Sequence, residues 1–274
     1  MKLIRPSWEV LDEKLLTEDA LRSIELAART CKKSEKYINE TSAEKICRMM
    51  IEEGHDAMLE FGPSIAVKFV CDRGVSHEIV RHRLCSFAQE STRYCNYSKD
   101  KFDNQVTFII PSWMTDLLEG EYSNKGDSDF IPYEMETAEE IWFMAMSKAE
   151  DAYNLLISKG WQPQQARSIL PNSLKTEIVV KANIREWRHI FIQRTSKAAH
   201  PQMRELMVPL LRHFKSLCPV VFDDILVEDE NLCDNCDYSK EFPHCPSANL
   251  IFGKGIGNDN IIKCDGWKYS GTSS

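Results

Sequence analysis

Three arginines, one histidine and two serines lie within the fourteen residues 81–94, which read RHRLCSFAQESTRY. Guanidinium groups bind phosphate oxygens through paired, charge-assisted hydrogen bonds, and serine hydroxyls can satisfy the remaining lone pairs. The whole chain has a formal net charge of -8, so this local concentration of arginine predicts an anion-binding pocket. For an Arg-His-Arg sequence taken alone, the alternative is a solvated basic face paired with neighbouring acids.

A second group of reactive side chains lies in the last part of the sequence. Cys233 and Cys236 have the Cys-x-x-Cys spacing of metal ligands, and His244, Cys245 and Cys264 follow. Four thiolates are enough for one tetrahedral zinc site. Because a second close Cys-x-x-Cys pair is missing, a structural zinc site, thiols without metal and an iron-sulfur cluster all stay open. We expect the other six cysteines to be reduced thiols in the core.

Two helices are expected before the first strand. Thr17 can cap the first, whose apolar stripe is Leu21, Ile24, Ala28 and Cys31. The sequence Thr41-Ser42-Ala43-Glu44 is a capping-box pattern for the second, which buries Ile46, Met49 and Met50 and stops at Gly54.

The basic segment is expected to follow a strand and a short helix. Apolar residues alternate at Ile65, Val67, Phe69 and Cys71, which predicts a strand that ends near residues 72–74. Ser76 can then cap a short helix that delivers Arg81, His82 and Arg83 at its far end. Residues 105–110 form another expected strand, stopped by Pro111.

The second half of the chain is expected to alternate helix and strand. Residues 115–136 are predicted to form an exposed excursion from the core. A capping box at Thr137 predicts the start of a helix that ends at Gly160. Its expected buried side is Ile141, Met144, Ala145 and Ala149. A strand at 175–182 precedes a helix capped by Asn183, and a last amphipathic helix runs from Met203 to Leu217 with Pro209 inside.

The basic segment closely resembles the signature motif of flavin-dependent thymidylate synthases, in which Ser-x-Arg-Tyr follows Arg-His-Arg after seven intervening residues. Gly54-His55 with Glu60 looks like the upstream flavin site of that family. The family's second signature is matched by Ala166-Arg167, Leu170-Pro171, Asn183-x-Arg185, His189 and Arg194. The resemblance covers about residues 1–222.

The resemblance implies an α+β fold, with a mostly antiparallel sheet flanked by helices, and a homotetramer with active sites between subunits. It implies reductive methylation of dUMP to dTMP, with 5,10-methylenetetrahydrofolate as carbon donor and NADPH, through FAD, as hydride source. A thymidylate synthase domain is expected at 1–228, followed by a Cys-rich tail at 229–274.

By resemblance, FAD contacts His55, Arg81, His82, Arg83, Gln89, Asn183, Arg185 and His189. The dUMP ligands are Glu78, Ser91, Arg93, Arg167 and Arg194. Arg194 is also the candidate catalytic residue, because it would polarise the pyrimidine ring.

Four residues depart from the common family pattern. Many members have Asn-Glu where this chain has Ala88-Gln89, glutamine in place of Glu78, and glutamine in place of His200. A carboxylate at position 78 would repel a phosphate unless it turns away or pairs with an arginine. These differences leave open a paralogue that acts on a modified pyrimidine nucleotide.

Other classes of protein are disfavoured by what the sequence lacks. It has no G-x-G-x-x-G, so a dinucleotide-binding βαβ unit is not expected, and no Pro-Cys-His of the folate-only thymidylate synthases. A net charge of -8 disfavours a nucleic-acid-binding module, the alternative for an Arg-rich segment with a zinc tail. Neither a signal peptide nor an apolar run of ~18 residues is present, so a cytoplasmic protein is expected.

Overall fold

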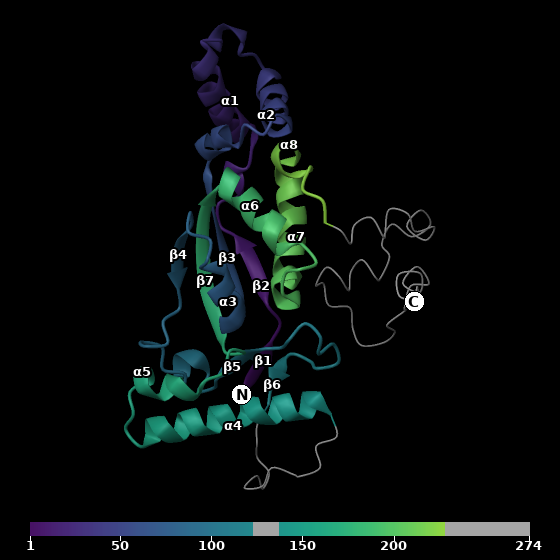
Figure 1. The fold of residues 1–274 in the computed structure, drawn as a ribbon. Helices are drawn as coiled ribbons and strands as arrows, with labels where there is room; N and C mark the ends of the chain where they lie inside the picture. Colours follow the sequence, from purple (N-terminus) through teal and green to yellow (C-terminus); the bar gives the residue numbers. More distant parts are fainter. Residues whose placement is uncertain (123–136, 228–274) are drawn as a thin grey trace, which may run out of the picture. The chain divides into compact units, whose positions relative to one another are not determined.

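The computed structural model describes residues 1–122 and 137–227. Helices and strands are mixed, and the strand pairs are mostly antiparallel (Figure 1), which confirms the expected α+β class. Two compact units are present: unit 1 comprises residues 1–11 and 66–181, and unit 2 comprises residues 12–65 and those from 182 onward. The predicted tail at 229–274 and most of the predicted excursion lie outside the described residues.

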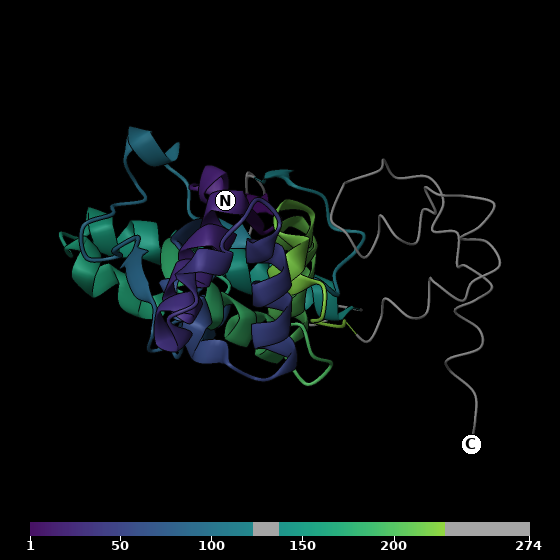
Figure 2. The same ribbon diagram turned by 90° about the horizontal axis from the view of Figure 1, so that it is seen from above.

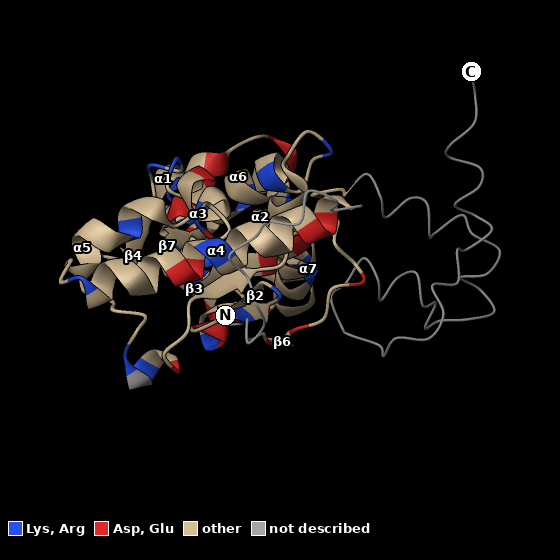
Figure 3. Cartoon of the chain, turned by 90° about the horizontal axis from the view of Figure 1, so that it is seen from below, with Lys and Arg blue, Asp and Glu red and all other residues tan. Residues whose placement is uncertain are grey.

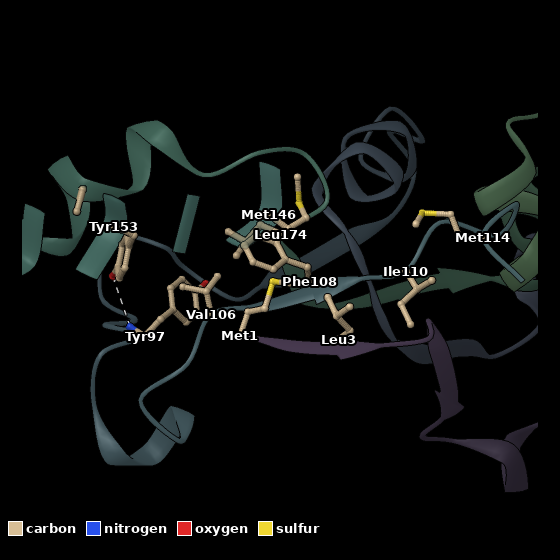
Figure 4. Packing of buried hydrophobic residues seen from close by; sticks show 11 residues of the cluster. Met1, Leu3, Tyr97, Val106, Phe108, Ile110, Met114, Met146, Tyr153 and Leu174 are labelled. Carbon is tan, nitrogen blue, oxygen red and sulfur yellow. Dashed lines mark hydrogen bonds between the residues drawn. The ribbon is translucent and has the colours of Figure 1, made fainter. Parts of the chain in front are cut away.

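A three-stranded sheet in unit 1 has the order β5-β1-β6. Strand β1 (Lys2–Ile4) pairs in parallel with β5 (Thr107–Ile109) and antiparallel with β6 (Gly120–Glu121). Strand β5 is shorter than the predicted 105–110, although Pro111 follows it as expected. The core around this sheet includes Leu3, Phe108 and Tyr153 (Figure 4), all with no exposed area.

Helix α4 (Ala138–Ser158) begins at the predicted capping box, with Thr137 accepting from the amide of Glu140. Its expected buried side was wrong in part: Ala149 packs against the core, but Ile141 is 57% exposed, and Met146 and Tyr153 are buried instead. This helix carries four acidic residues and a single basic one, Lys148, and both kinds of charge are visible on the molecule's face in Figure 3. The helix therefore presents no basic face to a polyanion.

The second sheet has four strands in the order β2-β3-β7-β4. Strand β2 is Ser7–Val10, β3 is Ser64–Asp72, β7 is Lys175–Asn183 and β4 is Ser86–Gln89. The β2–β3 and β4–β7 pairs are antiparallel. The predicted period-two burial of β3 and β7 is confirmed, because Val67, Phe69, Ile178 and Val180 are all buried.

Helix α3 (Arg73–Ile79) begins earlier than the sequence suggested. Asp72 is its N-cap, and its Oδ1 accepts from the amide of Val75 at 2.7 Å. The predicted cap, Ser76, is instead fully buried inside the helix and donates to the carbonyl of Arg73 at 3.0 Å. The carboxylate of Asp72, at the end of β3, caps the first free amides in preference to the hydroxyl of Ser76, because the N-terminus of a helix attracts negative charge.

Unit 2 is mainly helical. Helices α1 (Glu18–Lys32) and α2 (Ser42–Glu52) lie side by side (Figure 2). The others are α6 (Ile184–Arg194), α7 (Pro201–Leu217) and α8 (Pro219–Phe222). Trp187 stacks on Phe191 with centroids 5.6 Å apart, and its Nε1 donates to the carbonyl of Ile65 at 3.0 Å. The predicted helical stripe of α7 is buried around this aromatic core.

Two details of α1 and α2 differ from expectation. Thr17 and Thr41 are N-caps by position, but neither makes a side-chain cap hydrogen bond, so the capping box predicted at Thr41 is not formed. Cys31 is exposed, so it is not part of the α1 core stripe. Gly54 has a φ of 71° and ends α2 as predicted.

The remaining elements are short. Helix α5 is Pro163–Ala166, and the 3-10 turns are η1 (Glu13–Leu15), η2 (Glu35–Tyr37), η3 (Asp56–Phe61), η4 (Asp100–Phe102) and η5 (Arg167–Ile169). Within residues 1–122 and 137–227, none of the helices combines the length and apolar character needed to cross a membrane.

The six cysteines outside the tail are all free thiols, as expected. The expectation that all of them lie in the core holds for Cys47, Cys71 and Cys218. Cys31 is exposed, and Cys85 and Cys95 are half-buried. Burial raises the pKa of the Cys47 thiol to about 12, so this group stays protonated at neutral pH.

Candidate functional site

The Arg-His-Arg sequence lies directly after α3 in unit 1. The amides of Arg81 and His82 donate to the carbonyls of Glu78 and Ile79, each at 3.2 Å, which continues the helix by one turn. Arg81 and Arg83 are exposed, and neither guanidinium makes an ion pair or hydrogen bond with the residues that the structure describes. Two fixed backbone positions therefore present unneutralised guanidinium groups. His82 is 5% exposed between them.

Gln89 ends β4 and is held at the junction of three elements. Its Nε2 donates to Ser76 Oγ of α3 at 2.9 Å and to Thr176 Oγ1 of β7 at 3.2 Å. Arg73 Nη1 donates to the same Thr176 oxygen at 2.9 Å. The sequence had given Ser76 a different role and had assigned none to Arg73 or Thr176, and only their proximity in the fold shows that they position Gln89.

The second half of the basic segment forms a tight turn, the Ser91–Cys95 turn. The amides of Tyr94 and Cys95 donate to the carbonyl of Ser91 at 3.1 and 3.0 Å, and the amide of Arg93 donates to Ser91 Oγ at 3.3 Å. Arg93 is exposed, with its guanidinium carbon 5.5 Å from the centre of the Tyr94 ring.

Arg167 is brought to this same turn from a distant part of the sequence. Its Nη1 donates to Thr92 Oγ1 at 2.9 Å, a hydrogen bond between residues 75 positions apart. The structure thus gathers Ser91, Arg93 and Arg167, three of the five predicted dUMP ligands, around one turn. Two guanidinium groups and a hydroxyl at one turn can bind a phosphate dianion.

The predicted residues of unit 2 lie along α6 and before η3. Asn183 caps α6, with its Oδ1 accepting from the amide of Glu186 at 2.9 Å. Arg185 and His189 are both exposed, four residues apart on one helix face. Arg185 forms an ion pair with Glu60. His55, also exposed, has its Nε2 3.2 Å from Glu53 Oε2.

The arginines of α6 differ in how deeply they are buried. Arg194, the candidate catalytic residue, is half-buried at the end of the helix. Arg188 is 8% exposed and binds both oxygens of Asp224, at 2.6 and 2.7 Å, so its role is structural. Burial raises the pKa of Glu186, although the positive charges of His189 and Arg185 oppose the effect.

The structure shows the surroundings of His200 and Glu78, two of the residues that depart from the family pattern. His200 is the N-cap of α7, where its Nδ1 accepts from the amide of Gln202 at 3.3 Å. Glu78 is half-buried in α3, and its place in a nucleotide site stays a prediction. Cys233, Cys236, Cys245 and Cys264 lie outside the described residues. Within the described part of the chain there is no cluster of three or more metal-ligating side chains.

The arrangement of helices and strands matches a known fold. The fold is similar to that of the UMP/dUMP methylase PolB from Streptomyces cacaoi bound with 5-Br dUMP, with a TM-score of 0.59 and 20% sequence identity. The similarity covers 81% of this chain and 96% of that chain. At this identity the comparison establishes the fold.

The family follows from the sequence comparisons. Residues 14–220 match the family described as thymidylate synthase complementing protein. The flavin-dependent thymidylate synthase of Corynebacterium aurimucosum is 31% identical over 226 residues, which are 79% of this chain and 83% of that protein. The enzyme of the same name from Geobacter sulfurreducens is 28% identical, over 76% of this chain and 83% of its own. The chain therefore belongs to the thymidylate synthase complementing protein family, which includes flavin-dependent thymidylate synthases.

Proposed function

We propose that this chain is a flavin-dependent thymidylate synthase that converts dUMP to dTMP. The observation that carries the proposal is the Ser91–Cys95 turn, where Arg167 is hydrogen-bonded to Thr92, the residue between Ser91 and Arg93, in a member of this family. The phosphate of dUMP would bind there, because its oxygens need several strong donors at once.

Arg81 and Arg83 support the FAD part of the proposal. Both guanidinium groups are exposed and unneutralised by the described residues, so they can bind a pyrophosphate without first breaking an ion pair. Bound FAD, reduced by NADPH, supplies the hydride of the reaction, and 5,10-methylenetetrahydrofolate supplies the carbon. His55, His82, Gln89, Asn183, Arg185 and His189 are the other proposed FAD contacts.

Arg194 is the proposed catalytic residue. A guanidinium at a pyrimidine carbonyl stabilises the negative charge that develops on the ring during attack. Unlike Arg188, it lies at the end of α6 and is only half-buried, where it can reach a ligand. Glu78 completes the proposed dUMP contacts.

We extend the proposal to assembly and domains on the family resemblance. The chain would form a homotetramer with active sites between subunits, which mass measurement in solution tests. Residues 1–228 would form the catalytic domain, and residues 229–274 a separate Cys-rich tail that binds a structural zinc ion. The expected cytoplasmic location also stays a prediction.

The experiment combines a spectrum with a product assay. The purified protein should be yellow, with a flavin absorption band. With dUMP, 5,10-methylenetetrahydrofolate and NADPH it should form dTMP and tetrahydrofolate in equal amounts. Each substrate is omitted in turn as a control. Colourless protein that gains neither flavin nor dTMP formation when FAD is added would contradict the proposal.

A related nucleotide is the second candidate substrate. Glu78 and Gln89 differ from the common family pattern within the proposed binding residues, and the similar fold of PolB is that of a UMP/dUMP methylase. Competition between dUMP, UMP and 5-substituted pyrimidine nucleotides in the same assay decides between them. Faster turnover of any competitor than of dUMP favours this second candidate.

A further inference from the structure

Glu90, the residue before the Ser91–Cys95 turn, is anchored through its backbone. Its amide donates to the carbonyl of Glu177 in β7 at 2.8 Å. Its carbonyl accepts from Arg73 Nη1 at 3.4 Å. Both partners belong to regular elements of unit 1, so the point where the chain enters the turn is fixed on the sheet.

The carboxylate of Glu90 is anchored as well, by two donors from different elements. Its Oε1 accepts from the Tyr97 hydroxyl at 3.1 Å, and its Oε2 accepts from Lys175 Nζ at 3.0 Å. Lys175 also donates to Glu177 Oε1 at 2.6 Å, and Lys68 Nζ lies 2.6 Å from Glu177 Oε2. Lys68, Glu177, Lys175 and Glu90 thus form a continuous chain of alternating charges that ends at the residue before the turn.

Tyr97 is a rigid point of attachment. It is 4% exposed and packs against Phe102 and Tyr153, with ring centroids 5.2 and 5.8 Å away. Its amide also faces the Tyr153 hydroxyl at 3.4 Å (Figure 4). The carboxylate of Glu90 is therefore hydrogen-bonded to a side chain that the core holds in place.

Burial makes the Glu90–Lys175 contact strong. The two side chains are 12% and 17% exposed, so water screens their attraction less than at the surface. Burial favours the neutral amine of Lys175, but Glu177 and Glu90 outweigh it and raise its pKa. Burial, followed by the charge of Glu90, raises the pKa of Tyr97. At neutral pH both groups keep the proton that they donate.

We propose that Glu90 and Lys175 are a positioning pair for the Ser91–Cys95 turn, and that neither touches the bound nucleotide. Within the described residues, the exposed side chain of Arg93 contacts only the Tyr94 ring, and Tyr94 is itself 77% exposed. The turn is therefore anchored from its buried entry side. What the turn binds rests on the proposed function; how it is held does not.

The test compares Glu90→Gln, Lys175→Met and the double variant in the full-length flavoprotein. Arg48→Met is the control, because it removes an exposed ion pair with Glu44 in α2. We expect each single variant to raise the KM for dUMP at least about fivefold, with kcat within about twofold and the flavin band unchanged. The KM for dUMP of the double variant should be no higher than that of the more impaired single variant, because the two residues act as one unit.

Hydrogen exchange separates this inference from the proposed function. The amides of residues 93–95, which donate to Ser91, should exchange at least about tenfold faster in both single variants than in the wild type or the control. If the wild type does not methylate dUMP, the proposed function fails, and exchange alone decides the positioning claim.

Tyr97→Phe keeps the exchange test available if a charge variant does not fold, because it removes a single hydroxyl. Its amides 93–95 should also exchange faster than those of the wild type. Exchange at these amides equal to wild type in every folded variant overturns the proposal. So does a fall in kcat with an unchanged KM for dUMP.

Discussion

A hydrogen bond joins the second signature of the sequence to the Ser91–Cys95 turn, the proposed phosphate site. Arg167 Nη1 donates to Thr92 Oγ1 at 2.9 Å, and Thr92 is 5% exposed. Thr92→Val keeps the shape of the side chain but removes the oxygen. Arg167 then loses the hydrogen bond that holds its guanidinium at the turn.

The size of the effect follows from the burial of the two partners. A hydrogen bond to a charged group contributes about 1.5–3 kcal/mol when it is protected from water. Arg167 is exposed, so water replaces part of the lost bond, and about 1 kcal/mol remains. This corresponds to about a fivefold rise in the KM for dUMP. The kcat should change by less than about twofold, because the reacting atoms are not touched.

The assay is dTMP formation over a range of dUMP concentrations. Arg167→Met should raise the KM at least about thirtyfold, because a phosphate donor is lost outright. The double variant should match Arg167→Met, since Thr92 acts only through that arginine. Thr30→Val is the matched control, because its hydroxyl donates only to the carbonyl of Leu26 within α1, at 2.8 Å. A wild-type KM in Thr92→Val, with a large rise in Arg167→Met, refutes the idea that this bond orients Arg167.

Three further predictions concern stability, chemistry and metal. Asp224→Ala should destabilise the protein by about 2 kcal/mol in urea unfolding, because buried Arg188 loses two hydrogen bonds, and Arg188→Met in the same chain should recover part of the loss. Burial opposes ionisation of Asp224, but Arg188 outweighs it and lowers its pKa. This stabilisation is therefore complete above the ordinary pKa of about 3.9 and is lost as pH falls through the lower folded-state value, which melting temperatures of wild type and variant between pH 2 and 6 check. Arg194→Ala should abolish dTMP formation while the flavin band remains, and near-normal turnover would remove the catalytic assignment. Replacing Cys233 and Cys236 with serine should lower the zinc content measured by elemental analysis, and an unchanged content would exclude them as ligands.

Where a single local pattern was dominant, it correctly predicted the element that carries the site residues. The alternation of β3 and β7 and the Asn183 cap of α6 are confirmed, because a strand buried on one face and an N-cap both depend on neighbouring residues. The predicted start of α3 was wrong because Asp72 and Ser76 lie four residues apart and both are good N-cap residues. Their competition is decided by where β3 ends.

Tertiary packing decided what the sequence left ambiguous. Helix α4 has apolar residues on several sides, and the fold buries Met146 and Tyr153 rather than Ile141. Likewise, nothing in the sequence singled out Lys175, because its partner Glu90 lies 85 residues earlier and only the fold brings them together. The resemblance named residues that contact ligands in the family, but the residues that hold them required a structure.

The carboxylates near the turn explain how an acidic protein can keep its arginines available for an anion. Glu90 directly precedes the turn, and its amide donates to the carbonyl of Glu177; a free carboxylate so close to the turn would oppose the binding of an anion. Instead, Lys175 binds both carboxylates and Lys68 binds Glu177, which lowers the pKa of Glu177. A phosphate bound as we propose would then contact the arginines without displacing an internal ion pair, whose desolvation and rupture would weaken binding. If the turn binds the phosphate as we propose, the lysines would contribute to anion binding without contacting the anion, because they already pair with Glu90 and Glu177.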